Sequence, residues 1–222
     1  MIFQECDLGW IYQNEKVIIF FGNKKSSQES LQKGFSEIQF RRLKQTHSDI
    51  CVTSSETLVE ADAHITNCLQ TGLIISTADC MPILIFCPKT ESVAAVHAGW
   101  RGIVNQITKK TIQKMTSAGT DPSQLEVWIG PHVMQKSFEV EENVMSQIKN
   151  SSNEKSEEVF QKRNSKFYID LMEVLKSQLN DLNVKIGTNN CLLIDTKTTS
   201  SVHSYRRDMA QSGRNLSFIC LK

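Results

Sequence analysis

Three dense apolar segments dominate the middle of the chain. They cover residues 72–79, 81–87 and 92–96, and Pro, Gly and polar residues bound them. Apolar and β-branched runs of about four to eight residues with such boundaries are typical of buried strands. The short polar link 88–91 joins the last two segments in the manner of a hairpin. The sequence therefore predicts three buried strands at the centre of the fold.

Shorter strands are predicted on both sides of this block. Residues 10–12 and 17–21 bracket the polar turn 13–16 and indicate an opening hairpin. The stretch 40–46 alternates, and its period of two places four side chains on one face: Arg41, Leu43, Gln45 and His47. The other expected strands are 50–53, 126–129, 192–195 and 218–221, with a short strand or irregular segment at 61–66.

Helices are predicted between and after the strands. The longest, 103–118, repeats apolar residues at helical spacing and is closed by Gly119. Ser26 and Glu29 fit a capping box that begins a short helix running to about Phe35. Further helices are expected over 141–149 and 170–182, and an exposed polar loop over 151–158. With no internal repeat or strong boundary, this pattern predicts a single α/β domain over residues 1–222.

Composition and charge narrow the setting of the protein. With 40% hydrophobic and 22% charged residues over 222 positions, the chain is ordinary for a globular protein. A net charge of +1 gives no electrostatic case for binding nucleic acid or an anionic membrane. No apolar run approaches a membrane span, and Glu5 and Asp7 lie where a signal peptide carries basic residues. The seven cysteines lack paired spacing, which predicts reduced thiols in the cytoplasm.

The predicted strand ends deliver one thiol and two imidazoles. Cys80 follows the segment 72–79, His97 follows 92–96, and His47 follows 40–46. Thiolate and imidazole are zinc ligands, and a catalytic zinc site keeps three protein ligands with an open fourth position. A structural zinc site would need a fourth Cys or His and usually a close CxxC pair, which this chain lacks. The set therefore predicts a catalytic zinc site.

The same three side chains permit a second interpretation. Cys80 as a thiolate, with His97 or His47 as its base, would form a nucleophilic pair. Each of the three residues taken alone is more often a packed core residue than a ligand. Two imidazoles for one thiol favour the metal.

Basic residues near these strand ends predict an anion site. Arg101 lies near the start of a helix, where backbone donors and the helix dipole favour an anion. Arg206 and Arg207 add guanidinium groups, which bind phosphate or carboxylate in a bidentate manner. The competing interpretation is ion pairing with Asp79 or Asp208, and we expect it for one of Arg206 and Arg207.

A general acid is harder to choose from the sequence. The candidates are His132, Asp62 and His64, and their geometry decides between them. His132 follows Gly130-Pro131 at a strand end. At that position a histidine that borders the cleft and a histidine that lies in a turn are equally expected. Asp79 faces away from Cys80 along the strand, so we expect it to support the structure rather than bind a metal. His203 has a weaker claim.

Six short segments form a distinctive set along the chain. They are Gln45-Thr46-His47, Ala61-Asp62-Ala63, Thr77-Ala78-Asp79-Cys80-Met81-Pro82, His97-Ala98-Gly99-Trp100-Arg101-Gly102, Ile129-Gly130-Pro131 and Ser204-Tyr205-Arg206-Arg207-Asp208. In these segments and their order from residue 45 to residue 208, the sequence resembles the YfiH-type family, also called the purine nucleoside phosphorylase or laccase-like (polyphenol oxidoreductase) family. The pair formed by the third and fourth segments is highly specific.

The resemblance implies an α/β/β/α sandwich with mixed sheets, similar to the catalytic domain of the cytotoxic necrotizing factor toxins. It places the family's metal triad on His47, Cys80 and His97. It also implies zinc-dependent phosphorolysis of adenosine, inosine and methylthioadenosine, together with deamination of adenosine. Purine nucleosides and phosphate are then the expected partners, with a homodimer as one expected assembly. The expected substrate and phosphate residues are Gln45, Arg101, His132, Arg206 and Arg207.

Two departures from the family pattern bear on substrate preference. His132 stands where the family often has Cys, and Val202-His203 replaces an aromatic pair. Proteins of this type are also called copper laccases and peptidoglycan-editing factors. A copper-dependent polyphenol oxidase and a Cys–His amidase acting on a peptidoglycan precursor are therefore alternatives. Multicopper oxidases need many His ligands and this chain has five His in all, although one thiolate and two imidazoles also suit a single Cu²⁺.

Overall fold

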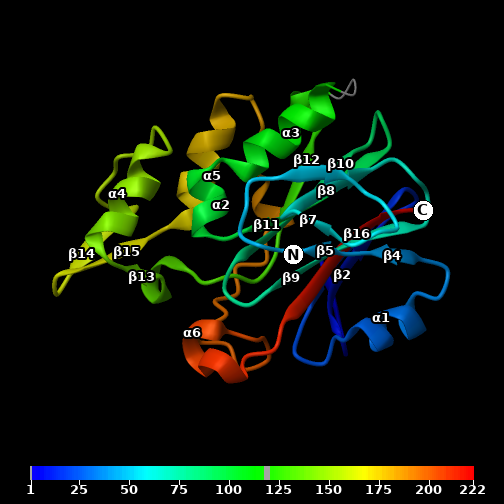
Figure 1. The fold of residues 1–222 in the computed structure, drawn as a ribbon, viewed down its shortest axis with the longest axis horizontal. Coiled ribbons are helices and arrows are strands. Elements are labelled where there is room, and N and C mark those ends of the chain that lie inside the picture. The colour runs from blue at the N-terminus through cyan, green and yellow to red at the C-terminus, as the bar shows by residue number, and fades with distance from the viewer. Residues whose placement is uncertain (1, 118–120) are drawn as a thin grey trace.

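Two large mixed β-sheets form the body of the protein (Figure 1). The computed structural model describes residues 2–117 and 121–222. The six-stranded sheet has the order β1 (Gln4–Cys6), β2 (Gly9–Gln13), β3 (Val17–Gly22), β16 (Asn215–Leu221), β9 (Thr71–Thr77) and β4 (Gln39–Arg41). The five-stranded sheet has the order β12 (Glu126–Ile129), β10 (Met81–Cys87), β11 (Ser92–Ala98), β8 (Ala63–Thr66) and β6 (Cys51–Thr53).

Smaller elements surround these sheets. A three-stranded sheet orders β13 (Glu139–Val140), β15 (Lys166–Ile169) and β14 (Phe160–Arg163), and a two-stranded one pairs β5 (Leu43–Lys44) with β7 (Val59–Glu60). The α-helices are α1 (Gln28–Gly34), α2 (Trp100–Val104), α3 (Ile107–Ser117), α4 (Glu142–Asn150), α5 (Leu171–Asn180) and α6 (Tyr205–Asp208). Short 3₁₀ turns cover Pro122–Gln124, Gln135–Ser137, Thr188–Asn190 and Met209–Gln211.

The inner faces of the two large sheets pack on each other. One cluster of buried residues joins Leu73 and Ile219 of the first sheet to Leu84 and Trp128 of the second. Strand alternation sends the neighbouring side chain Ile74 to the opposite face, where it packs with residues of α1. Burying each such side chain contributes about 1.5–3 kcal/mol. The intersheet core therefore fixes the register of β9, the strand that leads to the candidate site.

Helices cover the outer faces of both sheets. The outer face of the five-stranded sheet packs on residues of α2, α3 and α5, while α1 covers the six-stranded sheet from the other side (Figure 1). The layers are thus helix, sheet, sheet and helix, in agreement with the mixed α/β fold expected. Similarity to the necrotizing factor domain, and the one-domain organisation, stay predictions. No helix of residues 2–117 and 121–222 is long and apolar enough to cross a membrane.

The central strands and the opening hairpin are confirmed. The three apolar segments are β9, β10 and β11, and the last extends to Ala98, so that His97 lies in the strand. The hairpin β2–β3 pairs residues 9–13 with 18–22. Five other expected segments agree to within about two residues: β6, β8, β12, α4 and α5.

The helix predicted over 103–118 is instead two helices. It begins earlier, at Trp100, and α2 ends at Val104. Gln106 has φ +57°, and a residue in that region cannot continue a right-handed helix. Arg101 therefore lies in the first turn of a five-residue helix. The predicted end at Gly119 lies outside the described residues.

Three other predictions are corrected. The stretch 40–46 is two strands in different sheets, since β4 pairs with β9 and β5 with β7. Residues 192–195 form no strand, and only isolated bridges such as His132 to Asp195 connect this segment to its neighbours. The capping box lies one residue later, at Ser27 and Ser30, because the Ser26 hydroxyl donates to the carbonyl of Asn23. The hairpin of β14 and β15 had no counterpart in the sequence analysis.

Candidate metal centre and cavity

A strained turn between β9 and β10 presents the Cys80 thiol. Asp79 has φ +85°, a region that non-glycine residues rarely adopt. Its carboxylate accepts hydrogen bonds from Thr196 Oγ1 at 2.6 Å and from the backbone N–H of Arg206 at 2.7 Å. These contacts offset the cost of the turn, which is on the order of 1–3 kcal/mol. Asp79 thus supports the structure, as expected, and holds the start of α6 beside Cys80.

Asp62 fixes the orientation of the His97 imidazole. His97 lies in β11, is 4% exposed, and its Nδ1 is 2.7 Å from Asp62 Oδ1. Burial lowers the pKa of His97, but the hydrogen bonds to Asp62 and Cys80 and the attraction of their charges outweigh burial and raise this pKa to about 9. Since Asp62 occupies Nδ1, a metal ion would bind the other ring nitrogen, Nε2, in place of its proton.

The same carboxylate holds His47. His47 has φ +61°, and its backbone N–H donates to Asp62 Oδ1 at 3.0 Å. His47 Nε2 lies 3.8 Å from Cys80 Sγ, and the rings of His47 and His97 are 4.8 Å apart. A Cβ at Gly99 would lie 3.0 Å from both Cys80 Sγ and His47 Cδ2. Gly99 therefore allows the close approach of these groups, and a larger residue would displace them.

The three side chains suit a metal ion. One ligand atom from each of His47, Cys80 and His97 lies within 4.8 Å of the others, and within residues 2–117 and 121–222 this is the one such group of three or more metal-binding side chains. Burial raises the pKa of Cys80, but the hydrogen bonds from the two histidines outweigh it and lower the pKa to about 6. The thiol is thus held as the thiolate that zinc and copper bind. The donor set fits a metal with an open coordination position.

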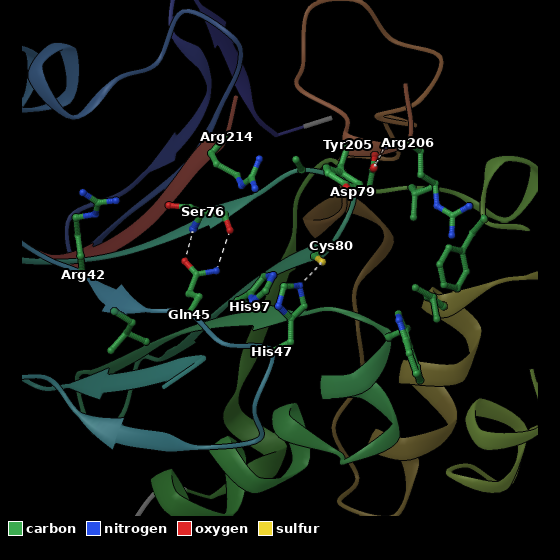
Figure 2. Close-up of a pocket in the computed structure, with 16 residues that line it drawn as sticks. Arg42, Gln45, His47, Ser76, Asp79, Cys80, His97, Tyr205, Arg206 and Arg214 are labelled. Atoms are coloured by element: carbon green, nitrogen blue, oxygen red, sulfur yellow. Dashed lines mark hydrogen bonds between the residues drawn. The ribbon is translucent and has the colours of Figure 1, made fainter. Parts of the chain in front are cut away.

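A cavity of about 530 Å³ opens above this cluster (Figure 2). Sites for small ligands are typically about 300–1,000 Å³, so the cavity is large enough for a nucleoside and a small anion. Its lining comes from both large sheets, from β5, from the loops after β4, β5, β9 and β12, and from helices α2, α5 and α6. The lining residues are Arg42, Leu43, Gln45, His47, Ser76, Ala78, Asp79, Cys80, His97, Trp100, Val133, Phe138, Leu171, Tyr205, Arg206 and Arg214.

Two of the predicted substrate residues line this cavity. Gln45 is held in place by β9, because its amide donates to the carbonyl of Ser76 and accepts from the N–H of Ser76, both at 2.8 Å. Arg206 is half-buried, and its guanidinium lies 4.8 Å from the ring centre of Phe138. Both side chains therefore lie where a ligand in the cavity would contact them.

Two of the predicted arginines lie elsewhere. Arg101 is exposed and absent from the lining, with its guanidinium 4.7 Å from the ring centre of Trp100. The short α2 carries this side chain along the outside of the helix and not into the cavity lining. Arg207 pairs with Asp208 and donates to four backbone carbonyls, those of Thr196, Lys197, Thr199 and Val202. Arg207 is therefore the one of Arg206 and Arg207 that forms the ion pair we expected.

None of the general acid candidates stands free in the cavity. Asp62 is fully buried and occupied by His97 and the turn of His47. His132 is 2% exposed, contacts the carbonyl of Gly130 through Nδ1 at 2.9 Å, and borders a separate hollow. His64 lies inside β8. None of the three lines the cavity, so geometry assigns Asp62 to positioning and the histidines to structure.

We expect His64 to make stability depend on pH. It is 1% exposed, burial lowers its pKa to about 3, and its Nε2 has no hydrogen-bond partner in the described part of the chain. In the unfolded chain His64 takes up a proton near pH 6.5, whereas in the folded protein it does so only at a lower pH. The folded protein is therefore most stable above about pH 6.5 and loses stability as the pH falls. Urea unfolding should show a weaker loss below about pH 6.5 in His64→Leu than in the natural protein. Parallel pH dependences would contradict this role for His64.

Five lining residues with aromatic or charged side chains were missed by the sequence analysis. Trp100 and Tyr205 lie inside the recognised segments, but nothing in their spacing separates a lining residue from a packed one. Arg42, Phe138 and Arg214 lie outside those segments, and the fold alone brings them to the cavity. The missed residues are Arg42, Trp100, Phe138, Tyr205 and Arg214.

The fold and the site define an α/β protein with a cavity of the size of a small molecule, beside three side chains that could bind a metal ion. The family model described as multi-copper polyphenol oxidoreductase laccase matches residues 5–222. The chain belongs to this family, whose YfiH-type members include purine nucleoside phosphorylases.

Relatives support this assignment in sequence and in fold. A purine nucleoside phosphorylase of Clostridium acetobutylicum is 37% identical over 185 residues, which cover 81% of this chain and 76% of that protein. One from Deinococcus radiodurans is 30% identical over 184 residues, or 82% and 70% of the two chains. The crystal structure of YlmD from Geobacillus stearothermophilus has a TM-score of 0.88 at 20% identity, covering 100% of this chain and 99% of its own. The Bacillus licheniformis protein YfiH has a TM-score of 0.83 at 21% identity, covering 93% of each chain.

Proposed function

We propose that this protein is a zinc-dependent purine nucleoside phosphorylase. The observation that carries the proposal is the ligand cluster of His47, Cys80 and His97 at the base of a nucleoside-sized cavity. The relatives named as purine nucleoside phosphorylases, at 30% and 37% identity, support the same activity. Adenosine, inosine and methylthioadenosine are the proposed substrates, with phosphate as the second one.

His47, Cys80 and His97 would hold the zinc ion. When bound, zinc supplies a Lewis acid that lowers the pKa of a coordinated water from 15.7 to about 7. The chain's own residues position the reactants: Asp62 orients the His97 ring, and Gln45 ties the loop before His47 to β9. Phe138 and Trp100 offer aromatic surface for a purine and keep water from it.

Phosphorolysis constrains where the two substrates lie. An oxygen of phosphate bonds to the ribose C1′ while the bond from C1′ to N9 of the purine breaks, and the leaving base takes a proton. The phosphate must therefore lie on the face of the ribose opposite the purine. A cavity with an aromatic side and arginines elsewhere in its lining is compatible with this arrangement. We also propose deamination of adenosine as a side activity. The oxygen of a water would bond to C6 of the adenine while the bond from C6 to the amino group breaks; one proton of the water would leave with that group as ammonia and the other would stay on the base, giving inosine.

Two other functions use the same residues. A Cys–His hydrolase or amidase is favoured by the low pKa of Cys80, about 6, and by the 3.8 Å between Cys80 Sγ and His47 Nε2. A copper-dependent polyphenol oxidase is favoured by the description of the family model. For that function the chain offers few further ligands, because His64 and His132 are buried away from the cavity.

An assay with adenosine, with and without phosphate, tests the proposal. The zinc-loaded protein should release adenine and ribose 1-phosphate only when phosphate is present, and it should form inosine without phosphate. Inosine as substrate isolates phosphorolysis, because it has no amino group to lose. A folded, zinc-loaded protein that turns over no nucleoside would contradict the proposal and favour the amidase. A homodimer and a cytoplasmic location stay predictions.

A further inference from the structure

The cavity has two unlike sides. Trp100, Val133, Phe138 and Leu171 all belong to, or pack on, the core cluster beneath the five-stranded sheet, and they form an apolar side. Figure 2 shows a polar side away from Arg206, with four labelled residues: Arg42, Gln45, Ser76 and Arg214. His47, Cys80 and His97 lie between the two sides (Figure 2). A ligand that spans the cavity therefore meets aromatic surface at one end and guanidinium groups at the other.

The fold places Arg42 and Arg214 on both flanks of β9. The sheet order β16-β9-β4 puts β9 between its two neighbours. Arg214 directly precedes β16, whose first residue, Asn215, pairs with Thr77 of β9. Arg42 directly follows β4, whose last residue pairs with Leu73 of β9. Both backbones are thus fixed by sheet pairing, one on each side of the strand that carries Ser76.

Both guanidinium groups keep unused donors. Arg42 donates through Nη1 to Gln28 Oε1 at 2.8 Å. Arg214 donates through Nη1 to the carbonyls of Ser212 and Gly213 at 3.1 and 2.9 Å. Neither forms an ion pair within residues 2–117 and 121–222. Each arginine carries five N–H donors, so most of them remain available, and no carboxylate offsets the charge.

Arg206 has different surroundings. Its guanidinium carbon lies 4.8 Å from the ring centre of Phe138, within cation–π distance, and the charges of Asp79 and Glu139 act on it. Burial lowers the pKa of Arg206, and these two carboxylates oppose that effect. An anion approaching Arg206 would also approach two acidic groups. A planar, neutral purine is better suited to this side of the cavity.

We propose that Arg42 and Arg214 form the phosphate subsite, and that the purine lies at the opposite end beside Phe138 and Arg206. This assignment rests on the proposed phosphorylase function. It places the ribose between the two ends, over the cluster of His47, Cys80 and His97. It also places phosphate and purine on opposite sides of C1′, as phosphorolysis requires. Arg42 and Arg214 then determine the affinity for the anion and contribute little to that for the nucleoside.

Binding of inorganic phosphate tests the subsite without any turnover. Titration calorimetry on the zinc-loaded protein, with and without saturating hypoxanthine, should show phosphate binding. Arg42→Gln and Arg214→Gln should each weaken it about tenfold or more, because charged hydrogen bonds to phosphate are lost. Arg163→Gln is the matched control, since Arg163 is exposed on β14 and stacks on Tyr168. Arg206→Gln should weaken binding of hypoxanthine and leave that of phosphate within about threefold.

The outcomes separate this proposal from the phosphorylase function. If Arg206→Gln weakens phosphate binding while Arg42→Gln and Arg214→Gln do not, the subsite lies at the other end and the proposal is wrong. Absence of phosphate binding both with and without hypoxanthine would overturn it as well. Phosphate binding that depends on Arg42 and Arg214, in a protein that turns over no nucleoside, would retain the anion subsite and reject the phosphorylase. In active protein, the two substitutions should raise the KM for phosphate and leave that for inosine nearly unchanged.

Discussion

Cys80→Ala should abolish both metal binding and nucleoside turnover. The thiolate is one of three ligands, and loss of a group that merely orients a ligand already costs about 10–100-fold in metal affinity. Loss of the ligand itself should therefore cost more than about 100-fold. Metal analysis of protein purified without added metal should find near-stoichiometric zinc in the natural protein and little in the variant. The same analysis decides between zinc and copper as the metal that the site retains.

Cys51→Ala is the matched control for this substitution. Cys51 is also half-buried, but burial raises the pKa of its thiol and it lies outside the cavity lining. The control should keep its zinc and its activity. If Cys80→Ala carries as much zinc as the natural protein yet is inactive, Cys80 is not a ligand. The Cys–His nucleophile would then be the better account of the site.

The sequence predicted the central strands because their signal is local. Each of β9, β10 and β11 is a dense apolar run between polar boundaries, and burial on both faces requires that pattern. The split of 40–46 into β4 and β5 has no such signal. The alternation continues through Arg42 in the sequence. However, β4 before Arg42 pairs with β9, and β5 after it pairs with β7, so the two halves lie in different sheets. Tertiary pairing decides that boundary.

The ligand cluster was predictable, whereas the rest of the cavity was not. Cys80 and His97 follow or end strong strand signals, and their chemistry is distinctive in a chain with five His. Arg101 was predicted at the anion site from its place near a helix start, but α2 has only five residues and the Arg101 side chain lies outside the cavity lining. Arg214 had no signal at all, because one surface arginine resembles another until the pairing of β16 with β9 places it near the end of β9. Asp62 was one of three general-acid candidates, and its hydrogen bonds to the metal ligands had no sequence signal, since its partners lie 14–16 and 35 residues away.

Asp62→Asn should destabilise the protein and weaken zinc binding together. The buried carboxylate accepts hydrogen bonds from the backbone of Thr46, His47 and Ser48, from the Ser48 hydroxyl and from His97 Nδ1. The asparagine amide has only one acceptor oxygen. Its NH₂ group would take the place of the second carboxylate oxygen and would face the N–H and O–H donors that this oxygen now accepts from. Leaving buried donors unpaired around a former charge should cost about 2–4 kcal/mol of unfolding free energy. Because Asp62 also sets the His97 ring, zinc affinity should fall about 10–100-fold.

The acid behaviour gives an independent readout of the same carboxylate. Burial raises the pKa of Asp62, but the hydrogen bonds from His97 and Ser48 outweigh burial and hold this pKa well below its usual range. The stabilisation is therefore complete above the unfolded pKa of about 3.9 and is lost as the pH falls further. Urea unfolding of metal-free protein should show a gap between the natural protein and Asp62→Asn near neutral pH that narrows below about pH 4.

Asp195→Asn is the matched control for Asp62→Asn, because it also replaces a buried carboxylate but should leave the metal ligands in place. Asp195 is 4% exposed and accepts hydrogen bonds from Ser137 Oγ at 2.7 Å and from the N–H of Lys197 at 3.1 Å. It lies outside the cavity lining and is not a member of the ligand cluster. Its substitution should lower stability and leave zinc affinity, measured by competition with a chelator, unchanged. Equal zinc affinity in Asp62→Asn and the natural protein would show that His47 and His97 hold their places without this carboxylate, and that Asp62 serves folding alone.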